Sequence, residues 1–167
     1  MASFSYHKLF MSRTNSVVRS MQLRFSEKRD KNNRVIRPGR LVPFTVEQFR
    51  AHLLKFLGGV EDGVAQCRYC NSWLNIATVA CDHAIPVSRG GSLDLTNIEF
   101  PCKPCNNRKG KLMPDEFMAL LTGLEKWPAT ARNDVLHRLE IAVQLAAGVR
   151  RGITNKRNEA AQEQEDF

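Results

Sequence analysis

Several features that mark other classes of protein are missing from this sequence. No apolar run approaches the roughly 20 residues that a membrane-spanning helix needs, so no membrane partner is expected. The five cysteines are odd in number and follow no apolar signal segment, which argues against a secreted disulfide framework. Internal repeats are absent as well. What remains is a chain of 167 residues that suits one ordinary domain in a reducing, intracellular setting.

Acidic residues are scarce at the start of the chain. Residues 1–26 contain none, and residues 1–43 contain two against ten Lys and Arg, so this segment carries the whole net charge of +8. Its apolar residues are scattered, and Pro38-Gly39 indicates a turn or linker. We interpret residues 1–43 as a basic, poorly ordered arm that lies along the phosphate backbone of DNA. The candidate contacts in this arm are Arg34, Arg37 and Arg40.

Two other interpretations of the basic segment stay open. It can be a solvated tail without a partner. The first 26 residues, with spaced Arg, several Ser and no acid, also have the composition of an organellar transit peptide.

Helical patterns flank the middle of the chain. Thr45-x-x-Gln48 is a capping box, and Phe44 can pack against Phe49 as a hydrophobic staple, so a helix should begin at Thr45. The Gly58-Gly59 pair should end it.

Two more helices are predicted towards the C-terminus, over Pro114–Trp127 and Ala129–Gly148. Their apolar surfaces allow a homodimer but could equally wrap the core. Residues 151–167 have the composition of a polar tail. The predicted division is therefore an arm over 1–43, a domain over 44–150 and a tail over 151–167.

Two C-x-x-C pairs supply four thiolates, enough to close a tetrahedral zinc shell. A closed shell leaves no position for substrate, so this zinc would hold the fold and do no chemistry. The fifth cysteine, Cys81, ends an apolar stretch and is expected to be a small buried hydrophobe. The predicted zinc ligands are Cys67, Cys70, Cys102 and Cys105.

The segment between the pairs predicts two strands and then a helix. Asn75–Cys81 is rich in Val and Thr and reads as the first strand, and Leu95–Phe100 reads as the second. Ser88–Ser92 is a polar turn between them. A helix is expected from Asn106, directly after the second cysteine pair.

Side chains for phosphodiester hydrolysis lie within this segment. His83 is its only histidine, and a neutral imidazole can take the proton of a water molecule near pH 7. Asp82 offers a carboxylate and Asn106 a carbonyl oxygen, ligand types that suit Mg²⁺. Arg89, Arg108, Lys109 and Lys111 are candidate contacts with the nucleic-acid backbone.

The order D-H-x-x-P-x-S-x-G-G, L-x-N, C-x-x-C-N-x-x-K-G resembles the HNH (His-Me finger, ββα-metal) endonucleases, in their cysteine-bearing branch. The resemblance covers about residues 64–126. It implies an α+β fold with a zinc-stabilised ββα-metal core, flanked by helices.

The resemblance also implies roles for individual residues. His83 would be the general base, and Asp82 and Asn106 would bind a catalytic Mg²⁺ or Mn²⁺. Asn97 would brace the loop that presents His83. The family generally leaves 5′-phosphate and 3′-hydroxyl ends.

The expected function is therefore metal-dependent cleavage of DNA, one strand per active site. The cysteine pairs and the basic arm also suit a non-catalytic zinc module for DNA binding or assembly, and the site residues do not separate DNA from RNA or branched DNA. Size and layout favour a cytoplasmic protein of a phage, bacterium or mobile element, by family-level analogy.

Overall fold

The computed structural model describes residues 2–163 and shows helices around small antiparallel sheets. The helices are α1 (Ala2–Phe25), α2 (Val46–Phe56), α3 (Lys103–Lys109), α4 (Pro114–Glu125) and α5 (Ala129–Glu163). The strands pair as β1 (Lys28–Arg29) with β2 (Val35–Arg37), β3 (Ala65–Gln66) with β4 (Trp73–Leu74), and β5 (Asp82–His83) with β6 (Ile98–Glu99). The α+β class predicted from the sequence is therefore confirmed.

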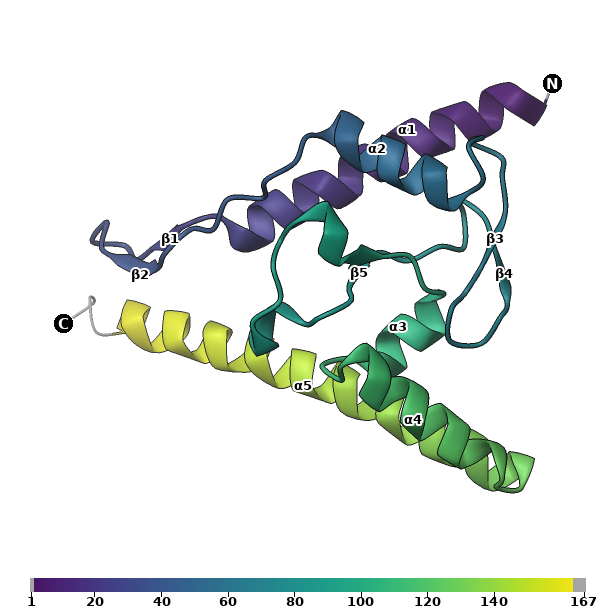
Figure 1. Cartoon of the computed structure of the whole chain (residues 1–167). Helices are drawn as coiled ribbons and strands as arrows, with labels where there is room; N and C mark the ends of the chain where they lie inside the picture. Colours follow the sequence, from purple (N-terminus) through teal and green to yellow (C-terminus); the bar gives the residue numbers. More distant parts are fainter. Residues whose placement is uncertain (1, 164–167) are drawn as a thin grey trace.

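The β5–β6–α3 unit lies at the centre of the molecule (Figure 1). Helices α1 and α2 lie on one side of it, and α4 and α5 lie on the other. Two one-turn 3₁₀ helices, Val87–Arg89 and Leu95–Asn97, form part of the loop between β5 and β6. Two strands followed by a helix form the ββα core that the resemblance implied.

Helix α2 forms as its capping signals predicted. The Thr45 hydroxyl accepts a hydrogen bond from the backbone of Gln48, and the Gln48 side chain accepts one from the backbone of Thr45. The rings of Phe44 and Phe49 stack with centroids 6.1 Å apart. Gly58 has a positive φ of 82° just after the helix, a conformation that glycine adopts at little cost.

The prediction of a poorly ordered N-terminal arm is wrong for residues 2–25, which form α1. Phe10, Thr14 and Val18 are fully buried along one face of this helix and belong to the central core. Arg13 donates to the carbonyl oxygens of Ala77 and Val79, the second at 2.9 Å. The apolar residues recur every three to four positions, the period of a buried helical face, and charged residues between them mask this pattern.

The predicted strand over residues 75–81 is also wrong. The Asn75 side chain accepts hydrogen bonds from the backbone of Ala77 and Thr78 and so forms a turn. Val79 forms an isolated bridge to Cys102, and Ala80 donates to the carbonyl oxygen of Pro101 at 2.8 Å, but residues 75–81 form no strand.

The second predicted strand is shorter than residues 95–100, because its first half is a 3₁₀ turn and β6 covers only Ile98–Glu99. Helix α3 begins before the predicted Asn106. The Cys102 sulfur caps it by accepting the N–H of Cys105.

At the C-terminal end, α4 begins at Pro114 as predicted, and α5 continues beyond the predicted Gly148 into the segment interpreted as a tail. Residues 164–167 of that tail lie outside the described residues. Across the described part of the chain, no helix combines the length and apolar character that a membrane span requires.

The burial of α1 predicts a large effect of one substitution. Phe10→Ala should lower the free energy of unfolding by about 3–5 kcal/mol, because a fully buried ring leaves a cavity. Leu9→Ala is the matched control on the neighbouring exposed position and should cost less than about 1 kcal/mol. Urea unfolding followed by circular dichroism measures both. Equal small losses would show that α1 does not belong to the core.

Candidate active site and metal centre

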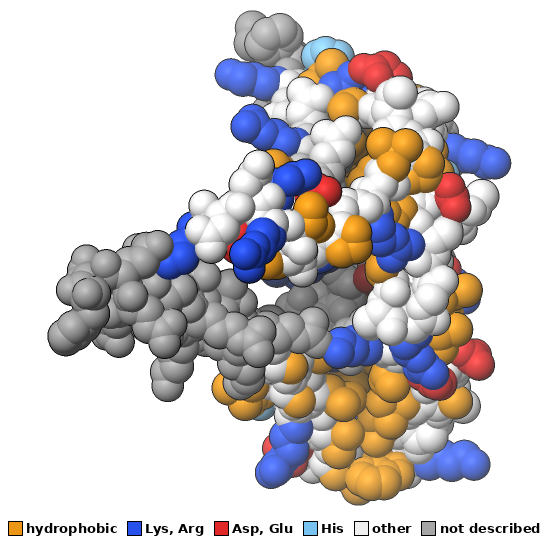
Figure 2. Space-filling model, turned by 90° about the vertical axis from the view of Figure 1, so that its left-hand side faces the viewer, with side chains coloured by type: hydrophobic (Ala, Val, Ile, Leu, Met, Phe, Trp, Pro, Cys, Tyr) orange, Lys and Arg blue, Asp and Glu red, His pale blue; other side chains and the backbone are white. Residues whose placement is uncertain are grey.

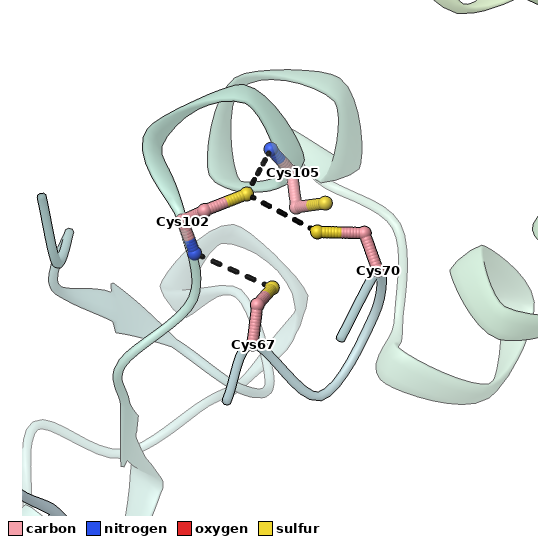
Figure 3. A group of neighbouring side chains, drawn as sticks. All are labelled: Cys67, Cys70, Cys102 and Cys105. Carbon is pink, nitrogen blue, oxygen red and sulfur yellow. Dashed lines mark hydrogen bonds between the residues drawn. The ribbon is translucent and has the colours of Figure 1, made fainter. Parts of the chain in front are cut away.

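Four cysteine sulfurs meet between two distant segments of the chain. Cys67 and Cys70 lie on the turn between β3 and β4, Cys102 caps α3, and Cys105 lies in its first turn. The four sulfur atoms all lie within 4.8 Å of one another, and Figure 3 shows them pointing towards a common centre. Backbone N–H groups of Cys102 and Cys105 donate to the sulfurs of Cys67 and Cys102, each at 3.4 Å.

The spacing of these sulfurs fits zinc. A tetrahedral ion with Zn–S bonds of about 2.3 Å places its ligands roughly 3.8 Å apart. The sulfurs of Cys70 and Cys102 are 3.7 Å apart. The cluster is therefore placed to bind a metal ion, and its sulfur ligands are the type that structural zinc prefers.

The pKa values of these thiols also indicate that a bound cation is needed to keep all four ionised. Burial, together with the neighbouring thiols, raises the pKa of Cys105 and Cys102 above the ordinary value. Burial opposes ionisation of Cys70 too, but hydrogen bonds from Ser72 and the neighbouring cysteines outweigh it and lower its pKa to about 7. Coordination would hold all four groups as thiolates.

Cys81 takes no part in the cluster. It packs against the core, and burial, followed by the charge of Asp82, raises its pKa to about 12. Such a thiol stays protonated and unreactive at neutral pH.

His83 is held in the short β5–β6 sheet. Asp82 pairs with Glu99 and His83 with Ile98 across this sheet. The His83 side chain is 8% exposed, and its Nε2 is buried with no hydrogen-bond partner among the described residues. An unpaired buried ring nitrogen costs free energy, so a water molecule or a ligand is expected to satisfy it.

The surroundings of His83 favour its neutral form. Burial lowers the pKa of His83, and the positive charges of Arg24, Lys109 and Arg40 act in the same direction, while Asp82 opposes them. A neutral imidazole has a lone pair that can accept a proton.

Asn97 ties together the loop between β5 and β6. Its Oδ1 accepts from the backbone N–H of Ile85 at 2.8 Å, and its Nδ2 donates to the carbonyl oxygens of Ile85 and Ser92 at 2.9 and 2.8 Å. Gly91 allows this close approach, because a Cβ there would lie 1.9 Å from the carbonyl oxygen of Ile85. This buried amide replaces sheet hydrogen bonds that the short strands do not make.

Lys109 joins α3 to the strand that carries His83. Its side chain is fully buried, and Nζ donates to Oδ2 of Asp82 at 2.8 Å and to the carbonyl oxygen of His83 at 3.1 Å. The prediction that Lys109 contacts nucleic acid is therefore wrong, because a buried ammonium cannot reach a DNA backbone. Its role in this structure is to orient Asp82 and the β5 backbone.

Asn106 lies one helical turn before Lys109. Residues three apart on a helix share a face, so Asn106 lies on the face of α3 from which Lys109 reaches Asp82. Its side chain is partly buried and makes no hydrogen bond with the described residues. The amide oxygen is thus available to a ligand.

The other predicted nucleic-acid contacts differ in whether they lie beside an acidic side chain. Arg89 pairs with Glu116, its Nη2 lying 2.9 Å from Oε1, and Arg108 lies 3.8 Å from Glu140. Lys111 is exposed.

The candidate contacts of the basic segment differ in their surroundings, and of the three only Arg40 is near enough to act on the pKa of His83. Arg34 and Arg40 are exposed, and Arg37 donates to the carbonyl oxygen of Ser26.

Sequence reasoning missed the contribution of α1 to this site. The ring of Phe25, the last residue of α1, lies edge-on to His83 with centroids 6.0 Å apart. The stripe Phe10, Val17, Val18, Met21 and Phe25 could have indicated a helix ending near the core. No pattern in the sequence indicated that its end meets His83.

The metal centre predicts a stoichiometry and a dependence on single cysteines. Purified protein should contain about one zinc per chain. Cys105→Ser should lose the zinc and most of the folded state, because a closed shell contributes folding free energy. Cys81→Ala is the matched control and should keep the metal. A folded, metal-free wild-type protein would contradict the assignment.

The Asp82–Lys109 pair predicts an asymmetric effect on stability. Lys109→Met should lower the free energy of unfolding by about 3 kcal/mol, because it leaves a largely buried carboxylate without its partner. Exposed Lys111→Met should change it by less than about 0.5 kcal/mol. Adding Asp82→Asn to Lys109→Met should recover part of the loss. Similar small losses in both single variants, measured in urea, would rule out a structural role for the pair.

Comparison with known proteins places this site in a family. Residues 67–121 match the family model described as HNH endonuclease. The match begins at the first cysteine of the cluster and ends within α4, so it contains the whole β5–β6–α3 unit. A search among curated proteins found no significant match. The segment from Cys67 to Leu121, with its cysteine cluster and its Asp82-His83 strand, is therefore the part of the chain that is similar to the HNH endonucleases.

Proposed function

We propose that this protein is a metal-dependent endonuclease that hydrolyses DNA phosphodiester bonds, with His83 as the general base. The observation that carries the proposal is His83 itself: a buried imidazole with an unpaired ring nitrogen, held on strand β5 of a segment that matches the HNH endonucleases. A structural zinc module has no need of such a group.

The base role rests on protonation and on placement. Burial and nearby cations keep His83 neutral at pH 7, the form that accepts a proton from water. The oxygen of that water would attack the phosphorus, and the bond from phosphorus to the 3′ oxygen would break. The leaving 3′ oxygen takes up a proton, so the products are a 3′-hydroxyl and a 5′-phosphate.

Asp82 and Asn106 fit a hard divalent cation. Lys109 contacts Oδ2 of Asp82, while Oδ1 makes no hydrogen bond with the described residues. Asn106 precedes Lys109 by three residues on α3 and therefore shares its face of the helix. A carboxylate and an amide oxygen, with room for waters, are the ligands that Mg²⁺ or Mn²⁺ takes. Such an ion would stabilise negative charge on the phosphate and the leaving oxygen.

Asn97 and Lys109 act as positioning residues for this chemistry. Asn97 fixes the loop that follows His83, and Lys109 fixes the carboxylate of Asp82 and the carbonyl of His83. Rigid placement matters, because an error of about 1 Å in a catalytic group can cost roughly a hundredfold in rate.

One active site cuts one strand, so the expected product from supercoiled DNA is a nicked circle. A homodimer would allow a double-strand break. Ile141 and Leu145 on α5 are exposed and keep that prediction open.

A plasmid assay tests the proposal. With Mg²⁺ or Mn²⁺, the wild-type protein should convert supercoiled plasmid to nicked circles before linear DNA appears. His83→Ala should lower the rate by about 10²–10⁴-fold, because the general base is lost. His137→Ala, which removes an exposed histidine of α5, is the matched control and should keep the wild-type rate.

The same assay separates the rival functions. Equal cutting by wild type and His83→Ala would point to a contaminating nuclease and reject the assignment. Binding without any cutting of DNA, RNA or branched DNA would instead favour the non-catalytic zinc module.

A further inference from the structure

The segment that links α1 to α2 is an ordered hairpin that starts at the candidate active site. The carbonyl oxygen of Phe25 accepts from the backbone N–H of Arg40 at 2.8 Å and closes the base of the hairpin. Because Phe25 contacts His83 edge-on, this base lies next to the proposed general base. The hairpin projects at the left of Figure 1, on the side that faces the viewer in Figure 2.

The turn of the hairpin is held by one acidic side chain. Oδ1 of Asp30 accepts from the backbone N–H groups of Asn32 and Arg34 at 2.9 and 2.8 Å. Asn33 has a positive φ of 63° at the tip, a conformation that asparagine tolerates better than most residues. The hairpin therefore presents its tip in one defined conformation.

Both acids of the hairpin are used internally. Asp30 holds the turn, and Glu27 pairs with Arg29 at 2.6 Å. The exposed side chains of Arg24, Lys28, Arg34 and Arg40 make no hydrogen bond or ion pair with the described residues. On this side of the molecule, Lys and Arg side chains are more widespread than Asp and Glu (Figure 2). The surface therefore suits a polyanion.

The tip of the hairpin also carries groups that can form hydrogen bonds with base edges. The side-chain amides of Asn32 and Asn33 are exposed and make no hydrogen bond with the described residues. Amides of Asn and the guanidinium of Arg are the groups that pair with adenine and guanine edges in the major groove. Val35 and Ile36, 47% and 64% exposed, offer apolar contact beside them.

The dimensions agree with a DNA groove. Seven residues separate Phe25 at the base of the hairpin from Asn32 at its tip, a reach of at most about 23 Å at 3.3 Å per residue. The major groove of B-DNA is about 12 Å wide and 8.5 Å deep and admits a two-stranded ribbon. The deep, narrow major groove of double-stranded RNA does not.

We propose that the hairpin is a double-stranded DNA-binding ribbon that positions the duplex for cleavage at His83. Arg24, Lys28 and Arg40 contact phosphates, and Asn32, Asn33 and Arg34 read base edges within about seven base pairs of the cut, given a rise of 3.4 Å per base pair. The cleavage step rests on the proposed function, but the binding step does not.

Binding is measured in a His83→Ala background, so that its outcome is independent of cleavage. Three sets of substitutions are compared by fluorescence anisotropy on a 30-base-pair duplex, on the same sequence as double-stranded RNA, and on a random duplex pool. The phosphate set is Arg24→Gln, Lys28→Gln and Arg40→Gln. The tip set is Asn32→Ala, Asn33→Gly and Arg34→Gln, in which glycine preserves the positive φ.

The third set is the matched control, Lys8→Gln, Lys55→Gln and Lys126→Gln. It removes three exposed charges away from the hairpin; Lys8 lies about 25 Å along α1 from Phe25. Thermal melting checks that all three sets fold.

The phosphate set should weaken binding to every DNA duplex by about tenfold or more, and the magnitude of the salt dependence, log Kd against log salt, should fall by about 2–3. The tip set should flatten the preference among duplexes by about tenfold. The control set should do neither, and duplex RNA should bind more weakly than DNA.

Equal effects of the phosphate and control sets would overturn the inference. So would an unchanged sequence preference in the tip set, or hairpin-dependent binding to RNA as tight as to DNA. Hairpin-dependent DNA binding by a protein that never cuts would uphold the ribbon and reject the nuclease.

Discussion

Four sulfur atoms within 4.8 Å of one another join two turns that lie far apart in the sequence, and the rest of the site depends on that junction. The strands it connects are two residues long, too short to form a stable sheet in water. The cluster fixes the start of α3, and α3 in turn carries Asn106 and Lys109 to β5. Without this junction, the position of α3 relative to His83 would rest on few hydrogen bonds.

Polar side-chain contacts add to the few backbone hydrogen bonds of the β5–β6 sheet. Lys109 reaches from α3 to Asp82 and to the backbone of His83, and Asn97 holds the loop on the other side. Both side chains are buried, so each contact forms in a low-dielectric setting where losing a partner is costly. Strand β5, which carries Asp82 and His83, is thus fixed by side chains more than by sheet pairing.

The sequence predicted the parts of this molecule that depend on short spacing. The capping box at Thr45, the two cysteine pairs and the order of strand, strand and helix needed only neighbouring residues. The turn at Asn75 was missed because a side-chain hydrogen bond there overrides β propensity.

Long-range packing could not be predicted in the same way. Helix α1 was missed because its buried stripe is interrupted by Arg and Ser, and its partners come more than 30 positions later in the chain. The pairing of Lys109 with Asp82 joins residues 27 positions apart, and no local pattern indicates it. Of the site, the sequence thus supplied candidate residues, while the contacts among them required the fold.

The contact of Arg13 with the carbonyl oxygens of Ala77 and Val79 has a consequence for recombination. A gene fragment that carried only residues 67–121 into a new host protein would leave these carbonyls and the core face of α1 unmatched. The unit that would have to be transferred to keep this packing therefore includes α1 as well as residues 67–121.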